Sequence, residues 1–302
     1  MGLFSRFFSQ QNKFNSLNPA PIEIDQEEIS DFDRLLQTSL SSYPQDYSER
    51  YSQKSPEFLQ ALVLASHEED RQALDLLAKL PIEEQDDLFD YELGVLMARH
   101  GHEQKACNTL RSCLKQNPDH LMAAEMLVML LVKLDQSDQA LELILQMVLE
   151  ERDSAFCHAQ LASLYHLRQD DELSLKHGLE AIKAGHDDPN ITLLAATLLE
   201  QNNELEQAEE LYSKILDGSV AEMGLYQAEF LLRQQRELNK VLDTFNTASA
   251  QEPENPRWKL RIAQTQIARG SKRKGQQLLR EVLSNPALTE KLRNEADTLL
   301  EK

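Results

Sequence analysis

The chain has 302 residues, of which 41% are hydrophobic and only 6% aromatic, and its formal net charge at pH 7 is −20. Glycine and proline are scarce, and the abundance of Leu, Ala, Gln and Glu favours helices over strands. A charge this negative argues against a general nucleic-acid binder, because neutralising phosphates requires a basic surface. The composition therefore predicts an all-α protein.

Three cysteines (Cys107, Cys113 and Cys157) form no CxxC pair, and an odd count argues against a disulfide framework. The most apolar run, residues 121–132, is short and contains Glu125, so no membrane-spanning helix is expected. The N-terminus lacks the pattern of a secretory signal. These features predict a protein of the cytoplasm.

Residues 1–53 form an N-terminal extension outside the repeats described below. Its first eight residues hold four bulky apolar side chains on one side of a short helix: Leu3, Phe4, Phe7 and Phe8. These side chains would dock on a partner, on the protein's own groove or on a membrane. Binding to a membrane would be weak, because cations are few. The alternative is an unremarkable flexible tail. The rest is expected to be flexible and acidic, with one further helix within residues 22–36.

Small residues recur every 34 residues or so from residue 54 onward. If Asp87 is position 1 of a unit, position 20 of successive units is Ala73, Ala106, Ala140, Ser174, Ala208, Val241 and Gly275. Helix periodicity alone does not place small residues at such a step. Two helices that cross closely at positions 8 and 20 of each unit do require them, because a large side chain would push the backbones apart.

The pattern divides the chain into seven units: 54–86, 87–120, 121–154, 155–188, 189–221, 222–255 and 256–289. Glu229 departs from the small-residue pattern at position 8 of the sixth unit, which leaves the start of that unit open by a residue or two. Residues 290–302 form an amphipathic helix that would cap the array, since the end of a solenoid needs a polar outer face.

The second unit carries the full set of marker residues at positions 7, 8, 15, 20, 24, 28 and 32: Leu93, Gly94, Gly101, Ala106, Leu110, Leu114 and Pro118. This spacing resembles the tetratricopeptide repeat (TPR), and the resemblance covers residues 54–302. It implies a right-handed α-solenoid of about seven helix pairs. It also implies a concave groove, lined by the first helix of each pair (helix A), that binds a protein or peptide and rarely has catalytic activity.

Positions 2, 5, 9 and 12 of helix A are the expected lining of the groove. They are Phe58, Leu62, Tyr91, Val95, Met122, Glu125, Met129, Phe156, Ser163, His166, Asn190, Thr197, Tyr226, Phe230, Arg233, Arg257, Leu260 and Gln264. Apolar and methionine side chains at one end would suit an amphipathic or apolar partner segment. The alternative for any one of them is that it packs between repeats.

Charge is unevenly distributed along the array. Eight cations and no acid lie between residues 257 and 280: Arg257, Lys259, Arg261, Arg269, Lys272, Arg273, Lys274 and Arg280. Acidic residues crowd the first repeats. Three interpretations of the basic end remain: a solvated surface, a docking site for an acidic segment, or a contact for head-to-tail self-association, anionic lipid or nucleic acid.

Chemistry-bearing motifs are missing from the sequence. It has no glycine-rich phosphate loop, HExxH or GxSxG, and His100 and His102 have no ligand-type partners at metal-site spacing. We therefore expect no enzyme, no cofactor and no metal. The leading hypothesis is an interaction scaffold or adaptor; the alternatives are a chaperone-like holder of secretion or membrane-complex subunits and a structural protein that self-assembles through its charged ends.

Overall fold

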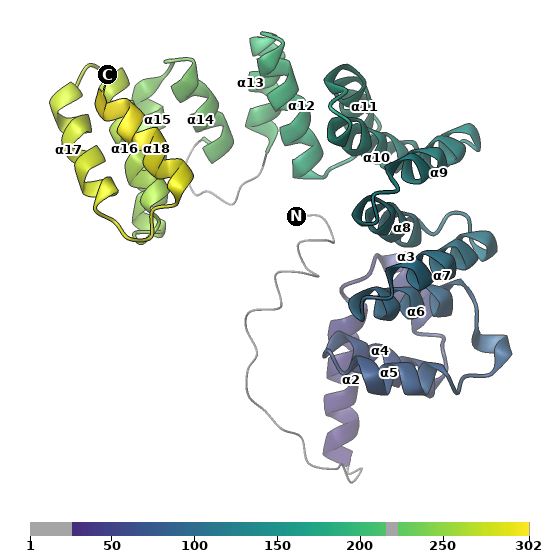
Figure 1. The fold of residues 1–302 in the computed structure, drawn as a ribbon. Helices are drawn as coiled ribbons and strands as arrows, with labels where there is room; N and C mark the ends of the chain where they lie inside the picture. Colours follow the sequence, from purple (N-terminus) through teal and green to yellow (C-terminus); the bar gives the residue numbers. More distant parts are fainter. Residues whose placement is uncertain (1–25, 216–222, 302) are drawn as a thin grey trace. The chain divides into compact units, whose positions relative to one another are not determined.

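The computed structural model describes residues 26–215 and 223–301, with side chains from residue 31 onward. Within these ranges the regular structure consists of seventeen α-helices and one short 3-10 helix, η2 (Ile82–Glu84), without a strand (Figure 1). The prediction of an all-α repeat fold is confirmed. None of the described helices is long and apolar enough to span a membrane. Residues Leu3, Phe4, Phe7 and Phe8 lie outside the described ranges.

Each of the seven expected units contains one helix pair. The pairs are α4 (Pro56–Ser66) with α5 (Asp70–Leu77), α6 (Asp87–Arg99) with α7 (Glu103–Gln116), α8 (Leu121–Lys133) with α9 (Ser137–Leu149), α10 (Ser154–Leu167) with α11 (Asp171–Lys183), α12 (Pro189–Gln201) with α13 (Leu205–Lys214), α14 (Leu225–Arg233) with α15 (Leu238–Gln251), and α16 (Pro256–Ala268) with α17 (Lys272–Leu283). A single helix, α18 (Glu290–Glu301), follows the last pair.

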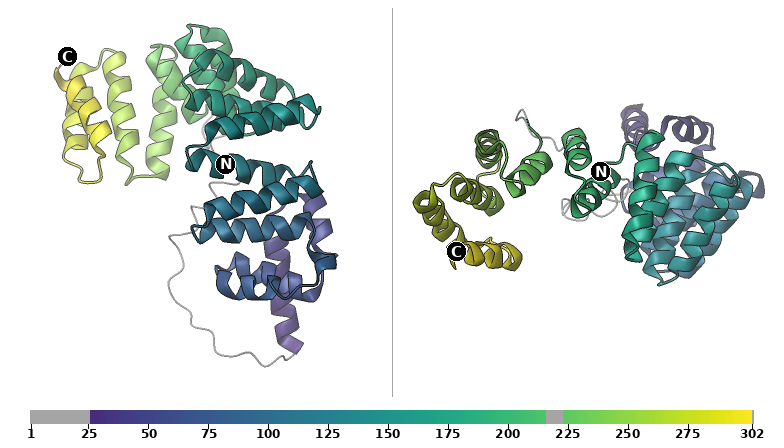
Figure 2. Two further views of the ribbon diagram at one scale, coloured as in Figure 1. Left: turned by 45° about the vertical axis from the view of Figure 1, so that its right-hand side comes forward. Right: turned by 90° about the horizontal axis from the view of Figure 1, so that it is seen from above.

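The chain divides into two compact units whose boundary lies within α10. The N-terminal unit comprises described residues 26–164, and the C-terminal unit comprises described residues 165–301. Within each unit the helices of a pair, such as α6 with α7 or α16 with α17, lie side by side (Figure 2). Each unit is considered by itself below.

Helix starts follow local capping rules. The side chains of Asp86, Asp188 and Asn255 accept hydrogen bonds from the first turns of α6, α12 and α16. Pro189 and Pro256 occupy the first helical position, where a missing N–H costs nothing. These residues therefore explain where the first helices of three repeats begin.

The turn between the two helices of a pair needs one residue in the left-handed conformation. That residue has positive φ in all seven repeats: Glu68, Gly101, Asp135, Gln169, Asn203, Gln235 and Gly270. Counted from the expected unit starts, it is position 15 in every repeat except the sixth, where it comes one residue early. Only two of the seven are glycine, so the other five carry a backbone conformation that costs about 1 kcal/mol.

The sixth repeat corrects the register expected from the sequence. Ala228, which is fully buried, occupies the small-residue position that the 34-residue step assigned to Glu229. A second residue with positive φ, Glu237, lies just before α15 and supplies the extra residue that restores the later register, so Val241 remains in the core. Glu229 is thereby turned out of the helix crossing.

Gly275 shows how closely the helices of a pair approach. A Cβ atom at this position would lie 2.8 Å from the backbone oxygen of Ala263 and would also clash with Ile267. Gly94 is similar, because a Cβ atom there would lie 2.9 Å from Cγ of Leu110. Ala263 and Gly275 are positions 8 and 20 of the seventh unit, so the expected crossing exists at those positions.

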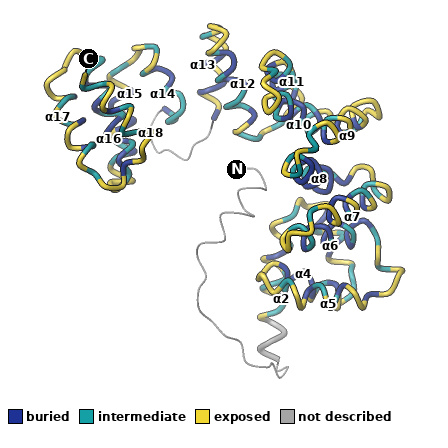
Figure 3. The backbone as a smooth tube through the Cα atoms, in the orientation of Figure 1, coloured by how far each residue is buried: buried dark blue, intermediate teal, exposed yellow. Residues whose placement is uncertain are grey.

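The cores lie between successive helix pairs, and the outward faces are exposed (Figure 3). In the C-terminal unit one apolar cluster contains Phe230, Phe245 and Trp258. A second cluster contains Leu260 and Leu279 and is covered by α18. The final helix therefore buries the apolar face of the last repeat, as a solenoid end requires.

Two helices precede the first repeat: α2 (Gln26–Leu40) and α3 (Gln45–Tyr51). The further helix expected within residues 22–36 overlaps α2, and α3 is a second helix that the sequence analysis did not single out. The hydroxyl oxygens of Ser39 on α2 and Ser66 on α4 are 2.7 Å apart, which joins α2 to the first repeat. The segment around α3 contacts three repeats and is described with the site.

Gly275→Ala is expected to destabilise the chain by up to about 2 kcal/mol. Overpacking against the Ala263 backbone costs about 1–3 kcal/mol and outweighs the gain in helix propensity of about 1 kcal/mol. The midpoint of urea unfolding, followed by circular dichroism, measures the change. The exposed neighbour substitution Gln277→Ala is the control and should shift stability by less than about 0.5 kcal/mol. A Gly275→Ala protein as stable as the wild type would contradict the close crossing.

Candidate functional site

The structure places the expected groove residues in three different environments. Seven of them have at most 5% of their surface exposed and belong to the packed interior: Phe58, Leu62, Tyr91, Val95, Met122, Phe230 and Leu260. Seven are half-buried: Glu125, Met129, Phe156, Ser163, Thr197, Tyr226 and Gln264. Arg257 is also half-buried, whereas His166, Asn190 and Arg233 are exposed. The seven buried side chains therefore pack between helices, which is the alternative that the sequence left open for each of them.

In the N-terminal unit the chain itself covers the inner face. We call residues 43–54, which include α3, the α3 segment. Tyr51 of this segment is fully buried against Phe58 of α4, with ring centroids 6.1 Å apart. The hydroxyls of Tyr51 and Tyr43 donate to the same carboxylate oxygen of Glu92 on α6, at 2.5 and 2.9 Å. Burial beneath these rings raises the pKa of Glu92, although the two hydroxyl hydrogen bonds oppose the shift.

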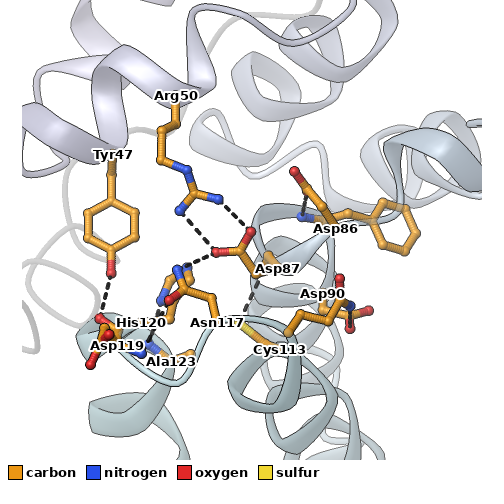
Figure 4. Close-up of polar contacts among 12 residues, drawn as sticks. Tyr47, Arg50, Asp86, Asp87, Asp90, Cys113, Asn117, Asp119, His120 and Ala123 are labelled. Carbon is orange, nitrogen blue, oxygen red and sulfur yellow. Dashed lines mark hydrogen bonds and ion pairs between the residues drawn. The ribbon is translucent and has the colours of Figure 1, made fainter. Parts of the chain in front are cut away.

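Charged contacts extend this interface along α6 (Figure 4). The guanidinium of Arg50 donates twice to the carboxylate of Asp87, at 2.9 and 2.5 Å, and Asn117 donates to the same carboxylate at 2.7 Å. Burial alone would raise the pKa of Asp87, but these hydrogen bonds and the charge of Arg50 lower it. Lys54 pairs with Asp86 at 2.5 Å. The α3 segment therefore neutralises part of the acidic cluster expected at this end.

The third contact of the segment is aromatic. Tyr47 lies over the ring of His120, which precedes α8, with centroids 4.7 Å apart, and its hydroxyl approaches the carbonyl oxygen of Asp119. Nδ1 of His120 accepts a hydrogen bond from the N–H of Ala123, whereas Nε2 is buried and has no hydrogen-bond partner among the described residues. Burial lowers the pKa of His120 to about 4, so the ring is neutral near pH 7.

The inner face of the C-terminal unit is open. One hollow of about 420 Å³ lies between α12 and α14, and another of about 320 Å³ is lined by α14, α16 and α18. Glu229 and Arg233 line both, so the two hollows form one continuous surface, which we call the C-terminal groove. Its apolar lining residues are Leu193, Tyr226, Leu232, Ile267 and Leu299.

Ion pairs link each repeat of this groove to the next. Arg233 of α14 donates to both carboxylate oxygens of Glu200 on α12, at 2.9 and 2.7 Å. Glu229 of α14 accepts from Arg257 and Arg261 of α16, at 2.7 and 2.9 Å. Arg261 continues to Glu295 of α18 at 2.7 Å. Every acid that lines the groove is therefore neutralised by an arginine of a neighbouring helix.

Glu229 owes its ionised state to these arginines. Burial would raise the pKa of this carboxyl, but the charges and hydrogen bonds of Arg261 and Arg257 lower it below its ordinary value of 4.5. Sequence reasoning missed the acids of the groove. The signal that would have found them is opposite charge at nearly one repeat of separation, as in the pair formed by Glu200 and Arg233.

The eight cations of the basic end divide into two groups. Arg257 and Arg261 are paired with Glu229 inside the groove and therefore do not contribute to the exposed basic surface. The remaining six are exposed on α16, on α17 and in the turn between them: Lys259, Arg269, Lys272, Arg273, Lys274 and Arg280. The exposed basic surface is thus smaller than the sequence suggested and lies mainly on the second helix of the last pair.

Glu229→Gln is expected to reduce the stability of the chain by about 2 kcal/mol at pH 7, because it removes charged hydrogen bonds to two arginines. The folded-state pKa is depressed, so this stabilisation is complete above the ordinary pKa of 4.5 and is lost as the pH falls through the lowered value. Urea unfolding at pH 7 and at about pH 3 should show the difference from wild type shrinking with acid. A stability difference between Glu229→Gln and wild type that is the same at both pH values would contradict this assignment. Glu206→Gln, at an exposed position, is the control.

Comparisons with known proteins agree with this architecture. The family model described as "Tetratricopeptide repeat" matches residues 22–219. The chain resembles the APC/C hetero-tetramer Cut9-Hcn1 with a TM-score of 0.54 and 11% identity; the match covers 91% of this chain but only 55% of that one.

Two further solved structures are shorter proteins that the chain covers almost completely. PilF of Pseudomonas aeruginosa matches with a TM-score of 0.52 and 13% identity over 78% of this chain and 99% of that one. PilW, described as a type IV pilus biogenesis factor, matches with a TM-score of 0.51 and 16% identity over 69% and 97%. These identities establish the fold alone, and no curated protein matches the sequence.

The family match extends over more than half of the residues, and the chain therefore belongs to the tetratricopeptide repeat family.

Proposed function

We propose that this protein is an interaction scaffold that holds an amphipathic segment of a partner protein in the C-terminal groove. Proteins of this family generally bind peptides or proteins and are not generally enzymes. The observation that carries the proposal is the continuous groove, formed by hollows of about 420 and 320 Å³, along α12, α14, α16 and α18. Grooves of this kind accept a helix or an extended peptide.

The lining of the groove indicates the chemistry of the partner. Tyr226 and Leu193 at one end and Ile267 and Leu299 at the other offer apolar contacts. Between them lie carboxylates that are already paired with arginines, so the groove carries little net charge. A segment with apolar residues on one face and neutral polar residues on the other would fill it without leaving a buried charge unpaired.

A holder that binds many unfolded apolar segments fits this geometry less well. The methionine-bearing half expected to serve that purpose lies in the N-terminal unit, where Met122 is buried and Met129 is half-buried. The C-terminal groove contains no methionine among its lining residues, and its walls are joined by ion pairs. Flexible methionine-rich surfaces favour promiscuous binding, whereas rigid walls favour one partner.

The partner can be captured with a photo-crosslinking amino acid at position 226, in cells of the native organism, and identified by mass spectrometry. The same amino acid at position 149, where Leu149 is 83% exposed on α9, is the matched control. A protein that crosslinks at position 226 and not at position 149 is the expected result. Loose crosslinking to many unrelated proteins would instead support the holder function.

Tyr226→Ala is then expected to weaken binding of that partner by at least tenfold. Truncating an aromatic anchor at an interface commonly costs about 2 kcal/mol, or about thirtyfold in the dissociation constant. Fluorescence anisotropy with the purified partner measures the effect, and Leu149→Ala should leave the affinity unchanged. If Tyr226→Ala keeps its helicity and binds the partner as the wild type does, the C-terminal groove is not the working site.

A further inference from the structure

The α3 segment of the N-terminal unit makes the contacts of a bound ligand. It crosses the beginnings of α4 and α6, which it touches through Tyr51 and Arg50, and reaches His120, the N-cap residue of α8, through Tyr47. The contacts of Arg50 and Tyr47 are drawn in Figure 4. Tyr47 and Tyr51 are four residues apart within α3 and so share one face of that helix, whereas Tyr43 precedes it. Repeat proteins of this architecture present the first helices of their pairs to partners in the same way.

The division of charge across this contact is also that of two partners. Arg50 of the α3 segment supplies the cation for Asp87 of the second repeat, and Lys54, at the junction of the segment with the first repeat, pairs with Asp86. Both hydroxyl groups that bond to Glu92 likewise come from the segment. Aromatic anchors surrounded by charged pairs are typical of interfaces between molecules, whereas a folded core is filled mainly by apolar side chains.

Release of the α3 segment from the repeats would leave no charged side chain buried without a partner. The raised pKa of Glu92 reflects its burial under the segment, and release would return the carboxylate to water together with its tyrosine donors. Nε2 of His120 is buried without a hydrogen-bond partner among the described residues while the segment is docked. An unsatisfied buried donor is a cost to the docked state.

We propose that the inner face of the first three repeats is a second binding site, for a partner helix that carries tyrosines four residues apart together with a neighbouring arginine or lysine, and that the α3 segment occupies this site in cis. Glu92 recognises tyrosine hydroxyls, Asp87 and Asp86 recognise the cations, and the faces of Phe58 and His120 receive aromatic rings. An acidic helix is excluded by the same carboxylates. The site lies within the N-terminal unit and does not depend on the C-terminal groove.

A synthetic peptide of residues 41–55 tests the proposal with the full-length chain. In the triple variant Tyr47→Ala, Arg50→Ala and Tyr51→Ala, the internal segment can no longer compete, because a tethered ligand normally excludes a free one by its high effective concentration. The labelled peptide should bind this variant at least tenfold more tightly than it binds the wild type. A peptide carrying Arg50→Glu and Tyr51→Ala should not bind.

The site itself is checked by adding Asp87→Asn and Glu92→Gln to the triple variant. Peptide affinity should fall at least tenfold further, because these substitutions remove the acceptors for the cation and the tyrosine hydroxyls. A folded triple variant that binds no peptide would overturn the proposal, and so would equal binding of the two peptides.

Hydrogen exchange of the wild type decides the matter if the triple variant does not fold. Amides of α3 should exchange at least tenfold faster than amides of α6, through an opening that leaves α6 intact. If α3 and α6 exchange together at one rate that follows global unfolding, α3 is an integral part of the fold and the site is not available to a partner.

Discussion

The two helices of every repeat cross where position 8 of the first meets position 20 of the second. At Gly275 the neighbouring backbone is so near that no Cβ atom fits, and fully buried alanines occupy most of the equivalent positions. Within each unit this close crossing sets the angle of each helix pair and turns the same side of its first helices toward one surface. The inner faces of both units, and all that binds to them, depend on this constraint.

The two units use their inner faces differently. In the N-terminal unit the α3 segment covers the face and places tyrosine and arginine side chains on the carboxylates of Glu92 and Asp87. In the C-terminal unit the face is open, and its acids are instead paired with arginines from neighbouring repeats, as Glu229 is with Arg261. Both units therefore carry acids on the faces of their first helices. A docked segment pairs with these acids in one unit, and arginines of neighbouring repeats pair with them in the other.

The helix pairs could be predicted because small residues at a fixed step are a direct consequence of helix crossing. The error at Glu229 arose where an extra residue before α15 shifted the register by one, which a fixed step cannot detect. The lining of the groove was harder to predict than the helix pairs. The exposure of a side chain such as Phe58 or Phe230 depends on which neighbouring repeats or segments cover that side chain. The α3 segment itself is polar and shows no repeat signal, so its docking follows only from the three-dimensional arrangement of Tyr43, Tyr51 and Glu92.

The central claim is that the inner face is filled in the N-terminal unit and open in the C-terminal unit, and hydroxyl-radical footprinting of the tyrosines tests it most directly. Tyr51 and Tyr91 are almost completely buried, whereas Tyr226 is partly exposed in the groove. In the native full-length chain, oxidation of Tyr226 should therefore be several times faster than that of Tyr51 and Tyr91, and the difference should vanish in denaturant. Oxidation of all three at similar rates in the native state would show that the N-terminal face is open as well, and would contradict the account.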